Sequence, residues 1–267
     1  MILDDDEIAA RVFYPRREKP PREVPGKIQV LAFPFSSTGK IGGLFFTRDP
    51  ELPTLLLFHG NGEIAHDYMQ AAPDYMNCGV NLAVVDYRGY GFSDGSPSFG
   101  TLLEDSKIAY DGLRAWLQRN HLDTRIIVFG RSLGSACAAE IGANHPAGLQ
   151  GIIFESGFGD LFDIMNRLFG VGVLKGITRD KLARWSNDTR VKQFTCPVLI
   201  IHGTDDVIIP VNQANVLHDA VPPGVYKRMV LIDGAGHNDI TCWPGEYFPP
   251  IKAFIETCTG RPWTREN

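Results

Sequence analysis

The stretch Ile126-Ile-Val-Phe-Gly-Arg-Ser-Leu-Gly-Ser135 decides the fold of this chain. A β-branched and aromatic run stops at a glycine-punctuated turn, and an alanine-rich helical pattern begins directly after it. The turn reads G-x-S-x-G, the pattern of a serine at a sharp reversal between a strand and a helix. Small residues are needed two positions either side of that serine, and Gly130 and Gly134 meet this need. We therefore expect Ser132 to be a nucleophile; the structural alternative is a helix-capping serine at a strand end.

The composition is that of an ordinary globular protein. Of the 267 residues, 44% are hydrophobic and 21% are charged, and the net charge of -5 comes without a clustered basic stripe. Nucleic acid and anionic membranes are therefore disfavoured as partners. The five cysteines are scattered and form no C-x-x-C pair, which argues against a disulfide framework or a zinc site. We expect a small-molecule substrate, no metal or other cofactor and no obligate membrane insertion; the oligomeric state stays open.

The amino terminus is acidic, where a secretory signal would be basic and then apolar. No uninterrupted apolar run in the sequence is long enough to cross a bilayer. These two features predict a cytoplasmic location.

From residue 54 onward, solid apolar runs alternate with helical patterns, which is typical of a parallel sheet covered on both faces. The predicted strands are 54–58, 81–86, 126–129, 151–154, 197–202 and 227–232, and the predicted helices lie near 64–78, 102–120, 132–144, 211–221 and 247–257. Two extended runs, 28–35 and 40–47, predict an antiparallel hairpin at the edge of that sheet. Residues 1–27 are charged and proline-rich, so we expect a surface lead-in followed by one domain over 28–267.

Two loops at strand ends supply polar groups beside the predicted nucleophile. In open α/β sheets the loops at the carboxyl ends of the strands build the site. The loop His59-Gly-Asn-Gly-Glu63 offers backbone amides near Ser132, so we expect the amides of Asn61 and Leu133 to form an oxyanion hole. A histidine that begins such a loop more often orients the loop than acts as a base, and we interpret His59 in this way.

Two later loops supply an acid and a base. The loop 202–206 reads His-Gly-Thr-Asp-Asp, and either Asp205 or Asp206 would orient a catalytic histidine. The loop Asp233-Gly-Ala-Gly-His-Asn-Asp239 brings His237 through small residues to a strand end, which predicts that His237 is the base. The chain order of serine, acid and histidine differs from that of trypsin-like and subtilisin-like enzymes.

The segments HGNG, DYRGYGFSDGSPS, GRSLGS, HGTDDVIIP and GAGHND together resemble the serine hydrolases of the α/β-hydrolase superfamily. They are most similar to the small lipase-like and serine-aminopeptidase-like branch, which includes the α/β-hydrolase domain-containing depalmitoylases. The resemblance implies an α/β-hydrolase fold, with a mostly parallel eight-stranded sheet, helices on both faces and a small helical cap. It also implies that Asp206 is the acid, with Asp205 and Glu155 as fallbacks. Gly62 departs from the family, which often has alanine there.

The expected cap covers about 158–194, because the chain between the strands at 151–154 and 197–202 is longer than one connecting helix requires. Apolar residues recur there at helical spacing from residue 161 to 169. We expect Phe158, Phe162 and Met165 to line an acyl pocket; the alternative is that this face only seals the cap onto the body.

The predicted function is a serine hydrolase that cleaves carboxylic esters or thioesters through an acyl-enzyme on Ser132. An aminopeptidase-like amide hydrolase of the same fold is one alternative. A non-enzymatic or very slow ligand-binding receptor is an alternative of a different class.

Overall fold

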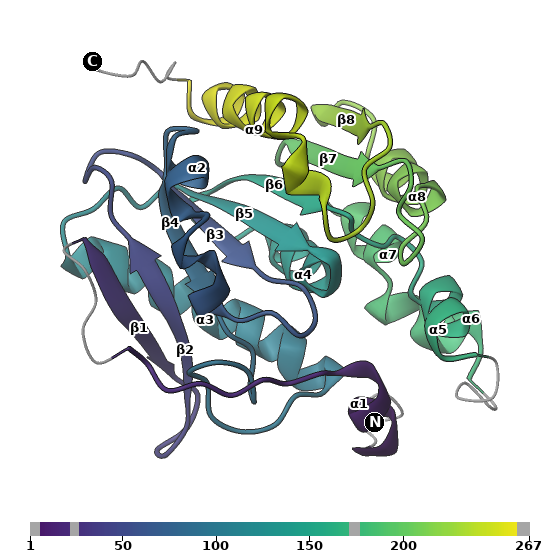
Figure 1. The fold of residues 1–267 in the computed structure, drawn as a ribbon, viewed down its shortest axis with the longest axis horizontal. Coiled ribbons are helices and arrows are strands. Elements are labelled where there is room, and N and C mark those ends of the chain that lie inside the picture. The colour runs from purple at the N-terminus through teal and green to yellow at the C-terminus, as the bar shows by residue number, and fades with distance from the viewer. Residues whose placement is uncertain (1–5, 22–26, 171–176, 261–267) are drawn as a thin grey trace.

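An eight-stranded sheet forms the centre of the protein (Figure 1). It is seen in a computed structural model that describes residues 6–21, 27–170 and 177–260. The strand order is β1-β2-β4-β3-β5-β6-β7-β8. The strands are β1 Ile28–Pro34, β2 Lys40–Phe46, β3 Thr54–Phe58, β4 Asn81–Val85, β5 Ile126–Arg131, β6 Leu149–Glu155, β7 Val198–Gly203 and β8 Lys227–Ile232.

All pairings from β4 to β8 are parallel, and β2 pairs antiparallel with both β1 and β4. The predicted mostly parallel sheet with an antiparallel hairpin at its edge is therefore confirmed. Parallel strands place their carboxyl ends at one edge of the sheet, so the loops after β3, β5, β7 and β8 meet there.

Helices cover both faces of the sheet, and each face has its own apolar core (Figure 1). Successive side chains of β3 point to opposite faces of the sheet, so Leu56 and Phe58 pack in one apolar cluster and Leu55 and Leu57 in the other. The first cluster includes side chains of α3 Phe99–Arg119, α4 Ser135–Asn144 and α8 Asn212–Ala220, and the second includes side chains of α2 Ala72–Met76 and α9 Pro244–Thr259. A buried leucine contributes roughly 2 kcal/mol through removal of its surface from water.

The helix predicted over 64–78 is wrong as a single element. The structure has a short 3-10 helix, η2 Ala65–Met69, followed by α2. Pro73 lies in the first turn of α2, where its missing N–H and fixed φ are tolerated. Inside one continuous helix the same residue would remove a backbone hydrogen bond, so the chain begins a second helix instead.

The connection between β6 and β7 contains short helices where the cap is expected. They are α5 Leu161–Phe169, α6 Arg179–Leu182, η4 Ala183–Trp185 and α7 Asn187–Val191. Figure 1 shows α5 and α6 projecting away from the sheet, whereas α7 packs against α4 and α8. Residues 171–176 of the expected cap lie outside the described residues. Within the described ranges, no helix has the length and apolarity that a bilayer span requires.

The amino-terminal segment is not confined to the surface, which corrects part of the predicted lead-in. It forms α1 Asp6–Val12, and both Val12 and Phe13 are buried. The ring of Phe13 lies 5.4 Å from that of Phe99 at the start of α3. Downstream, the backbone of Gly91 donates to Arg16 over 2.8 Å and so holds the segment along the body. These contacts join residues far apart in sequence, whereas the expectation rested on local charge and proline content.

Candidate active site

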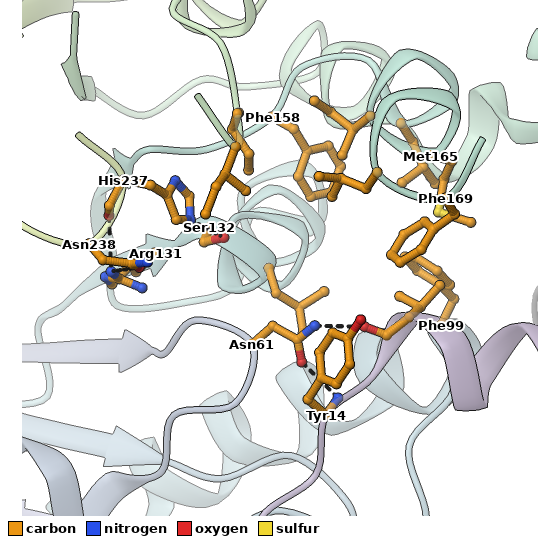
Figure 2. Close-up of a pocket in the computed structure, with 17 residues that line it drawn as sticks. Tyr14, Asn61, Phe99, Arg131, Ser132, Phe158, Met165, Phe169, His237 and Asn238 are labelled. Atoms are coloured by element: carbon orange, nitrogen blue, oxygen red, sulfur yellow. Dashed lines mark hydrogen bonds between the residues drawn. The ribbon is translucent and has the colours of Figure 1, made fainter. Parts of the chain in front are cut away.

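The turn after β5 places Ser132 in a strained backbone conformation. Its φ is 51°, in the left-handed region that a serine rarely adopts. A Cβ at Gly130 would lie 2.5 Å from the carbonyl oxygen of Gly134, and a Cβ at Gly134 would lie 2.1 Å from that of Phe58. Both glycines are therefore required by close backbone contact, as the sequence predicted. Held in this way, the Ser132 side chain lies at a cavity (Figure 2).

A chain of hydrogen bonds links three side chains from three different loops. His237 Nε2 lies 2.9 Å from Ser132 Oγ, and His237 Nδ1 lies 2.7 Å from Asp206 Oδ2. A carboxylate beside Nδ1 favours the tautomer that carries its proton there. Nε2 is then free to accept the proton of the serine hydroxyl, which is the arrangement that activates a nucleophile. The structure thus brings together the residues that the sequence named separately.

The Asp206 carboxylate is fixed from several sides. Its Oδ1 accepts hydrogen bonds from the amides of Ile208 at 3.0 Å and Ile209 at 2.8 Å, and His202 Nε2 lies 3.4 Å from Oδ2. Burial by itself would raise the pKa of Asp206, but the hydrogen bonds from His202, His237 and Ile209 outweigh it. The pKa of Asp206 is held well below its usual range, so this carboxyl stays ionised at neutral and mildly acidic pH.

The two fallback acids lie elsewhere. Asp205 is exposed, and its Oδ1 accepts a hydrogen bond of 3.3 Å from the Thr204 hydroxyl. Glu155 is buried but accepts a hydrogen bond of 2.5 Å from the hydroxyl of Tyr247. Among the described residues, Asp206 supplies the one carboxylate that hydrogen-bonds to the ring of His237. Adjacent acids could not be separated by sequence spacing alone.

His59 lies behind the loop that follows β3. Its Nδ1 lies 2.8 Å from the carbonyl oxygen of Gly60, and its Nε2 lies 3.4 Å from Asp86 Oδ1, with both side chains fully buried. Asp86 also accepts the backbone amides of Ala65 and Phe92. His59 therefore contributes to the shape of two neighbouring loops, in agreement with the orienting role that the sequence predicted for it.

Ser132 opens onto an elongated cavity of about 320 Å³ (Figure 2). Ser132 and His237 lie toward one end of it, and Met165 and Phe169 of α5 toward the other. Polar groups, including Asn61, lie mainly near the serine. The rest of the lining is apolar and comprises Val12, Phe99, Leu133, Phe158, Leu161, Ile164, Met165, Leu168, Phe169, Ile208 and Ile209.

Phe158 and Met165 line this cavity, but Phe162 does not, so the expectation for Phe162 is wrong. The residues of α5 that line the cavity occupy one helical stripe at Leu161, Ile164, Met165, Leu168 and Phe169. Phe162 is only partly buried, and its ring packs beneath the guanidinium group of Arg179, 5.2 Å from the ring centre. Helical spacing identified the apolar helix correctly, but it assigned one residue too many, Phe162, to the face that lines the cavity.

The amino-terminal segment forms a wall of the cavity that sequence reasoning missed. Asn61 Nδ2 donates to the carbonyl oxygen of Val12 over 2.6 Å, and Asn61 Oδ1 accepts from the amide of Tyr14 over 3.0 Å. The hydroxyl of Tyr90 donates to the same oxygen over 2.7 Å. The side chain of Asn61 is thereby locked, while Asn61 and Leu133 both line the cavity beside Ser132. The apolar pair Val12-Phe13 in a charged segment was the available signal for this wall.

We expect activity to survive alkylation of the cysteines. Cys137 lies on α4 just past Ser132, but it is fully buried, and burial raises the pKa of its thiol well above the usual value. Cys242 is exposed and should react first with iodoacetamide. Ester turnover followed beside mass spectrometry checks this. Inactivation in step with modification of Cys137 would contradict it.

Comparison with known proteins places this arrangement in a family. The family model described as "Serine aminopeptidase, S33" matches residues 50–175, a range that includes the Ser132 turn. Protein bem46 of Schizosaccharomyces pombe is 32% identical over 207 residues, which cover 76% of this chain and 67% of that protein. Alpha/beta hydrolase domain-containing protein 17C of Xenopus laevis is 29% identical over 208 residues, covering 76% of this chain and 61% of that protein.

Solved structures agree on the fold. Esterase Pf2001 of Pyrococcus furiosus matches with a TM-score of 0.70 at 19% identity, over 92% of this chain and 100% of that one. The match spans 67% of the length of protein bem46 and 61% of the length of protein 17C. The sheet order and the strand-to-helix turn at Ser132 agree with these matches. The chain therefore belongs to the α/β-hydrolase superfamily, in the serine-hydrolase branch that includes bem46 and the α/β-hydrolase domain-containing protein 17C.

Proposed function

We propose that this protein is a cofactor-independent serine hydrolase that cleaves carboxylic esters or thioesters with an apolar acyl group. The observation that carries the proposal is that the hydrogen-bonded chain Ser132, His237 and Asp206 opens onto a largely apolar cavity of about 320 Å³. Membership of the α/β-hydrolase superfamily and the fold shared with an esterase support it.

The proposed reaction follows the acyl-enzyme route. Ser132 Oγ attacks the acyl carbon while His237 Nε2 takes its proton, and the backbone amides of Asn61 and Leu133 stabilise the oxyanion. The tetrahedral intermediate collapses, and His237 returns the proton to the departing alcohol or thiol. A water molecule, activated by the same nitrogen, then attacks the acyl carbon and releases the acid. Asp206 remains ionised throughout and stabilises the imidazolium that forms in both halves.

The lining of the cavity favours an acyl chain over an aminoacyl group. An aminopeptidase must bind the ammonium group of its substrate, which calls for a carboxylate or a cluster of carbonyl oxygens. The described side chains that line the cavity include no aspartate or glutamate, and the one charged group among them is the Arg131 guanidinium. An apolar chain that leaves water gains up to about 0.8 kcal/mol per methylene in the same space.

A substrate panel tests the proposal. Purified protein is assayed on p-nitrophenyl esters and acyl thioesters of two to sixteen carbons, beside aminoacyl anilides. We expect ester turnover that rises with chain length by up to about four-fold in kcat/KM per added methylene until the cavity is full. Preferred turnover of aminoacyl anilides would support the aminopeptidase alternative. Stoichiometric labelling by a fluorophosphonate without turnover of any ester would support the ligand-binding alternative.

Met165 and Phe162, both on α5, give a matched pair of positions for a test of the acyl pocket. Met165→Gln places an amide in the apolar cavity and should reduce the rise of kcat/KM with chain length, whereas Phe162→Gln, outside the cavity on the same helix, should leave it intact. The ratio of octanoyl to acetyl ester activity is measured for both variants together with Tm. Equal loss for short and long esters in Met165→Gln would leave Met165 with a packing role only.

A further inference from the structure

The residue before the proposed nucleophile makes an unusual set of contacts. Arg131 ends β5, and its side chain is only 12% exposed. Its Nη1 pairs with Glu63, its Nε lies 3.0 Å from Glu155 Oε1, and its Nη2 donates to the carbonyl oxygen of His237 at 3.1 Å and to Asn238 Oδ1 at 3.2 Å. One guanidinium group therefore contacts three segments of the chain besides its own.

Each carboxylate partner is itself anchored. Glu63 Oε2 accepts from the amide of Gly60 at 2.9 Å and from the Tyr68 hydroxyl at 2.8 Å, so it closes the loop that carries Asn61. A Cβ at Gly60 would lie 2.4 Å from Arg131 Nη1, which shows how closely the guanidinium lies against this loop. On the other side, Glu155 at the end of β6 is fully buried and accepts from the Tyr247 hydroxyl.

The two carboxylates keep the Arg131 guanidinium charged and determine how its plane is oriented. Burial by itself would lower the pKa of Arg131, but Glu155 and Glu63 raise it above the usual value, so the group is always cationic. The guanidinium is planar and rigid. With Nη1 and Nε committed to two carboxylates, its remaining edge, Nη2, faces the segment around His237. A lysine ammonium carries its three N–H donors on a single nitrogen and lacks the planar fork that reaches these separated partners.

Arg131 is one of several groups that hold the segment carrying His237, beside the Thr204 hydroxyl and the Asp205 amide. This segment follows β8 through Gly234, whose φ is 73°, Ala235 and Gly236. Glycine-rich backbone has wide conformational freedom, so the strand end alone does not define the position of the imidazole. Asp206 holds the ring of His237 through Nδ1, and Arg131 holds the backbone of the same residue.

We propose that Arg131 is a positioning residue that fixes the His237 loop and the Asn61 loop relative to Ser132. It acts through the backbone of His237 and through Glu63, not by contact with the reacting atoms. The inference rests on the proposed function, since it assumes that Ser132 and His237 perform the chemistry. Loss of Arg131 should therefore slow acylation more than it weakens substrate binding, because a displacement of the base by about 1 Å costs on the order of a hundred-fold in rate.

Three variants test this inference. Arg131→Met keeps the apolar stem and removes the guanidinium, and Arg131→Lys keeps the charge without the fork. The matched control is Arg125→Met, at the residue directly before the same strand, where Arg125 pairs with Asp123 and donates to the carbonyl oxygen of Thr259. We measure kcat and KM for one ester, the second-order rate of fluorophosphonate labelling, and Tm.

We expect Arg131→Met to lose about a hundred-fold in kcat and in labelling rate with KM changed by less than about three-fold, and Arg131→Lys to recover part of that loss. Arg125→Met should change Tm but keep kcat per labelled site. If Arg131→Met does not fold, the double variant Arg131→Met/Glu155→Gln takes its place, because it also removes the buried carboxylate that would be left unpaired. The same losses in kcat and labelling rate are expected for it.

Wild-type kcat per labelled site in folded Arg131→Met or in the double variant would overturn the inference, as would an equal loss in Arg125→Met. These results leave the proposed function standing, because the wild-type protein would still hydrolyse the ester. A Ser132→Ala variant with normal turnover would instead overturn the proposed function, whatever the Arg131 variants do.

Discussion

Ser132→Ala is expected to abolish fluorophosphonate labelling and to lower ester turnover roughly a million-fold, the scale seen when a serine nucleophile is removed from a complete triad. The reason is geometric. Ser132 Oγ is the hydroxyl that lies 2.9 Å from His237 Nε2, so alanine leaves the base without a nucleophile to activate. The measurement is gel-based labelling beside steady-state turnover of the best ester in the panel.

The fold should survive this substitution. Alanine and serine pay the same conformational cost at the φ of 51° that the turn imposes, and the small side chain fits where serine fits. The lost hydrogen bond to His237 is worth about 1 kcal/mol, which corresponds to a shift of about 2–4 °C in Tm for a chain of this size. Normal labelling of a folded Ser132→Ala protein would remove Ser132 from the role of nucleophile.

The central sheet was accessible from sequence because its signals are local. The strands predicted at 54–58 and 227–232 agree with β3 and β8, since apolar runs bounded by turn residues need no knowledge of their neighbours. The turn at Ser132 was equally accessible, because Gly130 and Gly134 mark a backbone contact that admits no side chain. Where a local pattern and a steric requirement coincide, a sequence specifies structure reliably.

The walls of the cavity were less accessible because they depend on contacts between distant segments. The segment with Val12 and Tyr14 is held at the site by hydrogen bonds to Asn61 and by the packing of Phe13 on Phe99, and no spacing in the sequence reports those contacts. For Phe162 the sequence predicted a cavity contact that the structure lacks. Phe162 and Met165 belong to the same apolar helix, and the rotation of that helix about its axis decides that Met165 and not Phe162 lines the cavity.

The Arg131 cluster illustrates the same limit for charged groups. Its partners Glu63, Glu155 and His237 come from the loop after β3, the end of β6 and the loop after β8, and no local pattern in these segments predicts a contact with Arg131. The arginine occupies a variable position of the G-x-S-x-G pattern, which carries no expectation about its chemistry. Only the meeting of the carboxyl ends of the parallel strands brings these residues into one cluster.

Asp206→Asn is expected to lower kcat by roughly four powers of ten, the effect that the same change has in a serine-protease triad. The hydrogen bonds of the site explain why. Asp206 Oδ1 accepts two amides, from Ile208 and Ile209, so the carbonyl oxygen of an asparagine will take that position. Its NH2 group then occupies the place of Oδ2, 2.7 Å from His237 Nδ1. A donor at that place forces Nδ1 to accept, which puts the imidazole proton on Nε2 and prevents it from receiving the proton of Ser132.

Asp205→Asn is the matched control, because it makes the same chemical change one residue away at an exposed position. Its loss in kcat should stay within about three-fold, since a surface carboxylate in water is screened from the site. Both variants should keep a near-native Tm, because asparagine retains the acceptor for the two amides at Asp206. A larger loss in Asp205→Asn than in Asp206→Asn would move the acid by one position. Small losses in both would mean that the orientation of the His237 ring does not depend on either carboxylate.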